Sequence, residues 1–244
     1  MTVPSPNKAK YPPEILLGTV VKDLGVGLNL AFSWSPSQIA PYATRILGLG
    51  LNPNADVELI ISADTWKNVV DSVHTIAFPS LDKEVPLSLY AKRNLTVQLN
   101  NTSGSTISNY PLRIRYMVGL PETLEMGVPP INKKEIYETV VSKRITIAGS
   151  PGSPDTKNVV PITSVPSGRE HVITGITCSR LSGVQLVVER DGDKLLRLDT
   201  LAMPDLQEFA KIWVPARDSW RVYLEATVSG TVDVRLTYLE RSIP

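Results

Sequence analysis

The sequence predicts an all-β protein made of two tandem antiparallel β-sandwich domains of jelly-roll-like type. Three observations lead to this prediction. Val, Ile and Thr supply 62 of the 244 residues, and their branched Cβ atoms suit a pleated sheet better than a helix. Apolar and polar residues alternate in many short runs, and the second half of the chain repeats the pattern of the first.

Runs with a period of two define the expected strands. Leu95, Val97 and Leu99 share one face of the run 94–99, while the residues between them are polar. Trp220 matches Leu95 in the repeat, so we expect it in the core. One buried and one solvated face are typical of strands in antiparallel sheets.

Each half of the chain offers eight strand candidates, and Asp191-Gly192 between two apolar runs indicates a hairpin. Eight short antiparallel strands close a core as a two-sheet sandwich. Jelly-roll and immunoglobulin-like strand orders both stay open, because strand order is not visible in a sequence. The expected strands lie near residues 15–21, 26–33, 45–51, 56–62, 72–78, 85–91, 94–100 and 111–118, and near 138–147, 158–164, 171–178, 183–190, 193–200, 209–214, 219–227 and 231–240.

The repeat is clearest where residues 77–99 align without a gap to residues 202–224. Six of these 23 positions are identical at an offset of 125. The copies are of domain size, which is too long for solenoid repeats. We therefore expect an internal duplication, with the chain divided into an extended arm at 1–13, a first domain at 14–118, a proline-rich linker at 119–135 and a second domain at 136–244.

The residue types needed for catalysis are sparse. His74 and His171 lie in different halves and do not align with each other, so we interpret both as ordinary surface or edge histidines. Cys178 lies in a strand-like run and reads as a small buried residue. The three carboxylates within residues 189–193 lack calcium-loop spacing and are typical of a polar hairpin tip. The sequence thus predicts no enzyme, no metal site and no cofactor.

The tryptophans and the N-terminal arm offer the candidate interaction residues. Trp34, Trp66 and Trp213 are candidates for stacking on a ligand at a loop end. Trp213 lies on the face opposite its apolar neighbours, so we expect it to be an exposed interface residue. In the arm we expect an extended path that reaches an adjacent subunit through these residues: Lys8, Lys10, Pro12 and Pro13.

Charge and hydropathy name no further partner. The formal net charge of +1 gives no reason to expect specific nucleic-acid binding. No apolar run approaches the ~18 residues that a membrane-spanning helix needs. Residues 1–8 lack the apolar region of a secretory signal peptide.

The duplicated blocks 77–99 and 202–224, together with the proline-rich arm at 1–13, make the chain resemble tandem (double) jelly-roll virion proteins. The likeness is one of architecture over the whole chain. It implies a capsid or capsid-associated subunit located in the virion, which binds copies of itself, as a trimer in the favoured case, and other virion proteins. Two alternatives stay open: a carbohydrate- or receptor-binding sandwich with a glycan ligand, and a cytoplasmic location.

Overall fold

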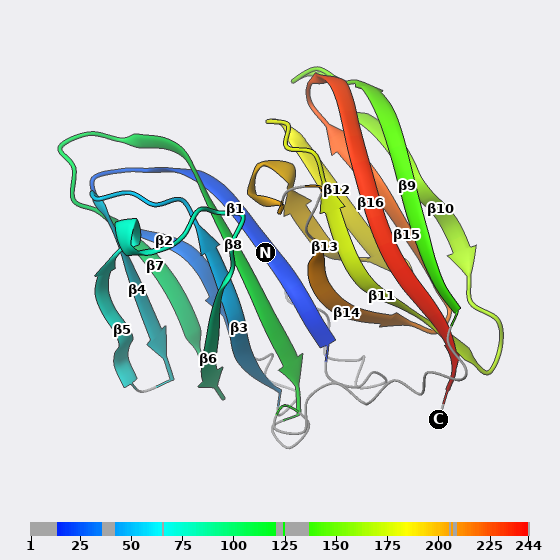
Figure 1. Cartoon of the computed structure of the whole chain (residues 1–244), viewed down its shortest axis with the longest axis horizontal. Helices are drawn as coiled ribbons and strands as arrows, with labels where there is room; N and C mark the ends of the chain where they lie inside the picture. Colours follow the sequence, from blue (N-terminus) through cyan, green and yellow to red (C-terminus); the bar gives the residue numbers. More distant parts are fainter. Residues whose placement is uncertain are drawn as a thin grey trace. The chain divides into compact units, whose positions relative to one another are not determined.

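The computed structural model describes residues 14–35, 42–64, 66–120, 124, 137–204, 206 and 209–243. The chain forms two compact units, the first containing Thr19–Gly127 and the second containing Val128–Pro244 (Figure 1). The short segment Glu14–Gly18, which the sequence places at the start of the first domain, belongs to the second unit.

The first unit has eight strands in two antiparallel sheets, with the orders β6-β3-β8-β1 and β2-β7-β4-β5. A 3-10 turn, Thr75–Ala77, follows the fifth strand, which is why that strand ends earlier than the sequence predicts. The strands are β1 (Glu14–Leu24), β2 (Gly27–Trp34), β3 (Ala43–Leu51), β4 (Val57–Ala63), β5 (Trp66–His74), β6 (Val85–Ala91), β7 (Leu95–Asn101) and β8 (Ile107–Gly119).

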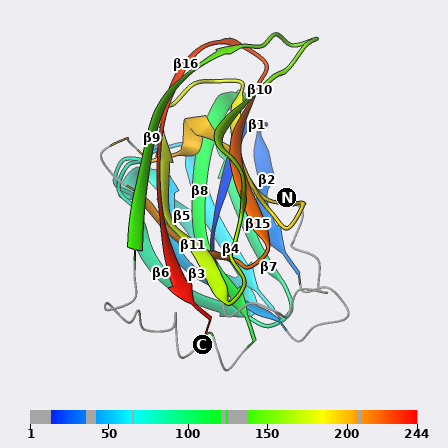
Figure 2. The same ribbon diagram turned by 90° about the vertical axis from the view of Figure 1, so that its right-hand side faces the viewer.

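The second unit repeats this plan, with the sheet orders β14-β11-β16-β9 and β10-β15-β12-β13. Figure 2 shows β9, β11 and β16 in one layer and β10 and β15 in the other. The strands are β9 (Tyr137–Ala148), β10 (Asp155–Ser164), β11 (Arg169–Cys178), β12 (Val184–Arg190), β13 (Asp193–Asp199), β14 (Ala210–Ala216), β15 (Ser219–Ala226) and β16 (Ser229–Ser242).

The strand order makes each unit a jelly roll. Within the first unit, the first strand pairs with the eighth, the second with the seventh, the third with the sixth and the fourth with the fifth. Adding eight to every strand number produces the order of the second unit. Nested pairing of this kind across two sheets is the double-sheet jelly roll, so the immunoglobulin-like alternative is excluded.

The two units also share their register. Ile46 pairs with Leu89, and Ile173 pairs with Val214 at the positions that match them. Both β3 and β11 are irregular just after these residues. The match extends to side chains: buried Thr75 donates to the Asn54 carbonyl, and buried Thr200 donates to the Leu181 carbonyl. The common origin of the two units in a duplication stays a prediction, which this register supports.

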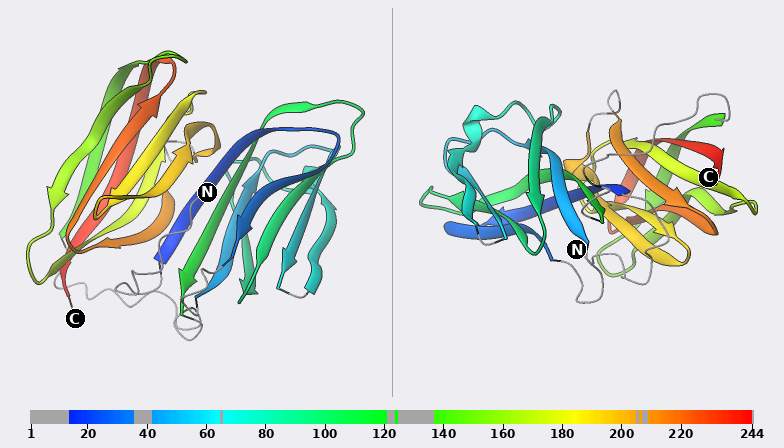
Figure 3. Two further views of the ribbon diagram at one scale, coloured as in Figure 1. Left: turned by 180° about the vertical axis from the view of Figure 1, so that it is seen from behind. Right: turned by 90° about the horizontal axis from the view of Figure 1, so that it is seen from below.

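Alternating burial confirms the expected strand faces. In β7, Leu95, Val97 and Leu99 are buried, and in β15 Trp220 and Leu224 are buried. These residues face the interior of their own sandwich, whose layers Figure 3 shows from two further sides. Burial of such side chains contributes roughly 1.5–3 kcal/mol each, which makes the inward faces the main source of stability.

Candidate functional site: positions where the two units differ

Because the two jelly rolls share one register, most described positions in one unit have an equivalent in the other. A feature common to both units serves the fold. A feature present in one unit only is a candidate for function, and four such features stand out.

The first feature is an apolar cluster on one sheet of the second unit. Val172 of β11, Trp213 of β14 and Leu239 of β16 are buried together, and Ile15 of β1 packs against them. The guanidinium carbon of Arg241 lies 5.2 Å from the centre of the Trp213 ring, as in a cation–π contact. The expectation that Trp213 is exposed is therefore wrong, since its side chain is 5% exposed.

The equivalent face of the first unit keeps an apolar residue where Leu239 lies, the buried Met117, but is polar at the other two positions. Arg45 stands where the second unit has Val172, and Ser88 stands where it has Trp213. Arg45 donates to the Ser88 hydroxyl from Nε at 3.0 Å and from Nη2 at 2.6 Å, and this contact is exposed. Alternation placed Trp213 on an outward face correctly, but it did not show that this face is covered in the second unit.

The second feature is a set of buried charges beside that cluster. Glu170 is fully buried, and its Oε1 lies 3.2 Å from Arg241 Nη2 and 3.8 Å from Arg217 Nη2. Glu14, at the start of β1, forms a buried ion pair with Arg190 of β12, which also donates to the Pro215 carbonyl. Breaking such a pair leaves an uncompensated buried charge, so these contacts hold the start of β1 on the second unit.

The third feature is an aromatic and imidazole cluster inside the second sandwich. Trp220 Nε1 donates to His171 Nδ1 at 2.9 Å, and Tyr238 packs against both rings. Since Nδ1 accepts this bond, the proton of a neutral His171 lies on Nε2, which faces Glu240 Oε2 at 3.4 Å. His171 is buried, so its interpretation as a surface or edge residue is wrong, and its ring has a structural role here.

The remaining candidate residues behave as the sequence predicts. The His74 ring is exposed, and its Nε2 lies 3.5 Å from Glu58 Oε1. Cys178 is fully buried, and this burial raises the pKa of its thiol to about 12. Asp191 and Gly192 form the β12–β13 turn with positive φ angles of 51° and 82°. None of these three sites assembles a nucleophile with a base among the residues that the structure describes.

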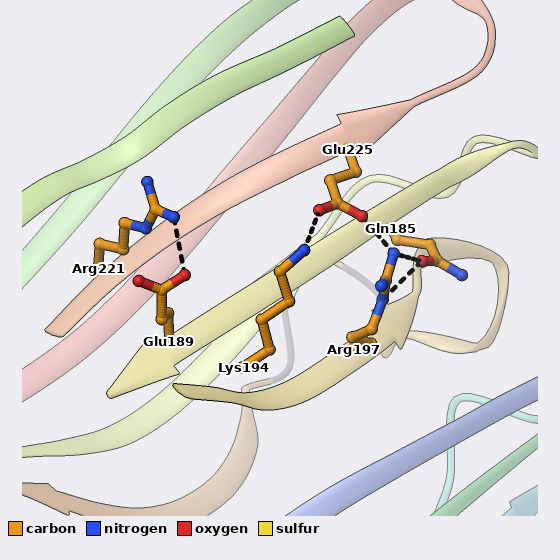
Figure 4. Close-up of polar contacts among 6 residues, drawn as sticks. All are labelled: Gln185, Glu189, Lys194, Arg197, Arg221 and Glu225. Atoms are coloured by element: carbon orange, nitrogen blue, oxygen red, sulfur yellow. Dashed lines mark hydrogen bonds and ion pairs between the residues drawn. The ribbon is translucent and has the colours of Figure 1, made fainter. Parts of the chain in front are cut away.

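A charged ladder covers the outer face of the β12, β13 and β15 strands (Figure 4). Glu225 binds both Lys194 and Arg197, and Arg221 binds Glu189 at 2.7 Å. Partial burial by itself raises the pKa of Glu225, but its two cationic partners outweigh this effect and leave the pKa lowered. Opposite charges alternate and neutralise each other, so this face offers no single-sign patch for a charged ligand.

The fourth feature is the edge strand β2 of the first unit. Leu28 and Leu30 are 63% and 51% exposed, and Val26 beside them is also exposed. On β7, Leu28 and Leu30 pair with Asn100 and Gln98, whose equivalents on β15 are Glu225 and Tyr223. These two pair with Thr156 and Asn158 of β10, which are therefore the equivalents of the leucines in the second unit. Exposed leucines at both positions in one unit, and polar residues in the other, mark β2 as a candidate contact surface.

The expected interface residues of the arm, Lys8, Lys10, Pro12 and Pro13, lie outside the described residues. Of the tryptophans proposed for stacking, Trp34 is buried, and the side chain of Trp66 is not described. In the described part of the chain, no group of three or more His, Cys, Asp and Glu residues is arranged to hold a metal ion. No helix among those residues is long and apolar enough to cross a membrane.

Sequence reasoning missed the buried charges and the exposed leucines. A buried charge leaves no pattern in a sequence until its partners are known, and Glu14 and Arg190 are far apart in the chain. The leucines left no signal either, because Leu28 and Leu30 continue the alternation of the buried Phe32 and Trp34. The irregularity of the β2–β7 ladder between Leu30 and Phe32 turns the two leucines to the exposed face.

Comparison with known proteins supplies no family. No family profile matches the sequence, and no curated protein matches it. Solved structures similar to the chain include the STIV MCP, with 11% identity, coverage of 92% of this chain and 96% of that chain, and a TM-score of 0.26. A second is from the atomic structure of Sulfolobus Turreted Icosahedral Virus, with 10% identity, coverage of 92% and 90%, and a TM-score of 0.26.

A third similar structure is the tandem CBM51 modules of a family 98 glycoside hydrolase from Streptococcus pneumoniae, with 10% identity. It covers 91% of this chain and 83% of that chain, with a TM-score of 0.26. At these TM-scores the assignment of the fold rests on the chain's own strand order.

Proposed function

We propose that the chain is a structural protein of a virion, a capsid or capsid-associated subunit that assembles with copies of itself. The observation that carries the proposal is the presence of two complete jelly rolls in one chain, with the same strand order and register. Viral capsid domains and lectin domains both use the double-sheet jelly roll, and they correspond to the structural role and to its carbohydrate-binding alternative.

The buried tryptophans favour the capsid class over the carbohydrate-binding class. A sugar-binding sandwich presents an aromatic ring to its ligand, whereas Trp34, Trp213 and Trp220 are all buried. The chain also has exposed apolar residues, Leu28 and Leu30, on a sheet edge where another protein strand can dock. We propose further that the chain is not an enzyme, since the buried His171 accepts a hydrogen bond from Trp220 and the Cys178 thiol is buried.

Mass photometry of the purified full-length chain over a range of concentrations tests this function. We expect oligomers, with the trimer as the favoured building block, and larger closed particles by electron microscopy at high concentration. The same preparation is applied to a glycan array. A chain that stays monomeric at every concentration and binds glycans contradicts the structural role and establishes the carbohydrate-binding alternative.

A further inference from the structure

We infer that β2 is a docking edge for β2 of a second copy of this chain, the two strands pairing antiparallel about a two-fold axis near Asn29. The inference rests on the proposed self-assembly and names the surface through which two copies meet. Its evidence is the composition of the edge strands, the exposure of two leucines and the comparison between the two units.

The composition of β2 sets it apart from the other strands that end a sheet. The strands β1 and β14 are not free edges, because they pair with each other at Ile15 and Trp213. Among the described edge strands β2, β5, β6, β9, β10 and β13, only β2 has neither a charged residue nor a proline. Charged side chains and prolines on an edge prevent it from pairing with another chain. The edge β6 contains Pro86, and the other four contain two or more charged residues each. An edge without these features is open to a further strand.

The same comparison selects the occupant. A partner strand from β5, β9 or β13 would bring charged residues to the contact, and one from β10 would set the polar Thr156 and Asn158 against the leucines. Pro86 of β6 lacks a backbone donor. Pairing β2 with itself brings no charge from either strand to the contact. Within this chain, β2 is therefore the edge that best complements β2.

Geometry places the two-fold axis near Asn29. Antiparallel self-pairing about that residue sets Leu28 of one copy opposite Leu30 of the other, and the reverse pair forms by symmetry. The ladder with β7 is irregular between Leu30 and Phe32, so the regular part of the free edge ends at Leu30. The carbonyl of Leu30 is reached from outside that ladder, because Lys22 Nζ donates to it at 2.9 Å. When a second strand pairs with β2, one of its backbone amides takes the place of Lys22 as the donor to the Leu30 carbonyl.

The second unit shows that the fold does not need the leucines. Thr156 and Asn158 occupy the equivalent places on β10, and both are exposed. The leucines are therefore an addition to a position that tolerates polar residues. A two-fold contact of this kind doubles whatever species the rest of the surface forms, from monomer to dimer or from trimer to hexamer.

The test transfers the second unit's residues to the first, in the variant Leu28→Thr/Leu30→Asn of the full-length chain. We expect the variant to remain folded by circular dichroism. In sedimentation equilibrium we expect the dissociation constant of the two-fold contact to rise by at least about tenfold, since two apolar side chains are removed from it. The matched control is Ile162→Asn, which removes an exposed apolar residue from the β10 edge. This control variant is expected to leave the dissociation constant of the two-fold contact unchanged.

Cysteine cross-linking tests the register. A mixture of the single variants Leu28→Cys and Leu30→Cys is expected to form an intermolecular disulfide, while each variant alone does not, because like positions are too far apart to bridge. The native Cys178 is buried and does not compete. If the wild-type chain and the double variant assemble equally, the β2 contact is contradicted and the proposed function is not. A wild-type chain that never self-associates overturns both.

Discussion

At the scale of single residues, Trp213 illustrates how one position differs between otherwise matching units. The indole lies among Val172, Leu239 and Ile15 in the second unit. Its equivalent in the first unit, Ser88, is part of an exposed hydrogen bond. A large aromatic side chain in such surroundings contributes to stability through the area that it removes from water.

We expect Trp213→Ala to lower the free energy of unfolding by about 3 kcal/mol, because the truncation leaves a cavity that its neighbours fill only in part. Urea denaturation followed by circular dichroism measures this change. The control is Ser88→Ala at the equivalent exposed position, with an expected change below about 0.5 kcal/mol. Equal effects of the two substitutions would contradict the buried position of the indole.

At the scale of elements, the turns between the sheets place strict demands on their backbone. Gly149 follows the last residue of β9, and its amide donates to the Val228 carbonyl at 3.1 Å. A Cβ atom at this position would overlap the carbonyl oxygen of Ala226, the last residue of β15. The backbone at Gly149 therefore has no room for a side chain next to β15.

Gly149→Ala is expected to lower the free energy of unfolding by about 2 kcal/mol, because the clash involves backbone atoms that cannot rotate away. Gly152 in the same turn has open space around its Cα atom, so Gly152→Ala serves as the control and should change the stability by less than about 0.5 kcal/mol. Thermal unfolding of both variants provides the comparison. The prediction fails if both glycines tolerate alanine.

At the scale of the whole molecule, the start of the described chain stabilises residues far from it in sequence. Glu14 and Ile15 contact Arg190 and Trp213 of the second unit. Removing residues 2–13 leaves these contacts in place, whereas removing residues 2–18 eliminates them. The two truncations therefore separate a role of the arm in assembly from a role of the first strand in stability.

We expect the chain lacking residues 2–13 to keep the wild-type stability, with weaker assembly if the arm binds a neighbouring subunit. The chain lacking residues 2–18 is expected to lose at least about 2 kcal/mol, because Arg190 loses its buried carboxylate partner. Tryptophan fluorescence in urea measures stability, and mass photometry measures assembly. Equal stability of the two truncated chains would contradict the contribution of Glu14 and Ile15.

The sequence by itself was sufficient for the fold class and most strand positions, for a physical reason that particular residues make clear. Leu95, Val97 and Leu99 show their period directly, because a strand face is a local property of the chain. The Asp191-Gly192 turn is likewise local, since two adjacent residues adopt positive φ angles. The repeat was visible because both units need apolar residues at the same inward positions.

Only the tertiary structure decided the strand order, the cover over Trp213 and the partners of the buried charges. Each depends on segments that are distant in the chain: the Glu14–Arg190 pair joins residues 176 positions apart. The burial of His171 was decided in the same way, by Trp220 on the facing sheet. A sequence pattern records which face of a strand is apolar, but the free energy of a contact depends on what the fold brings to that face, and this is set by the three-dimensional arrangement of the strands.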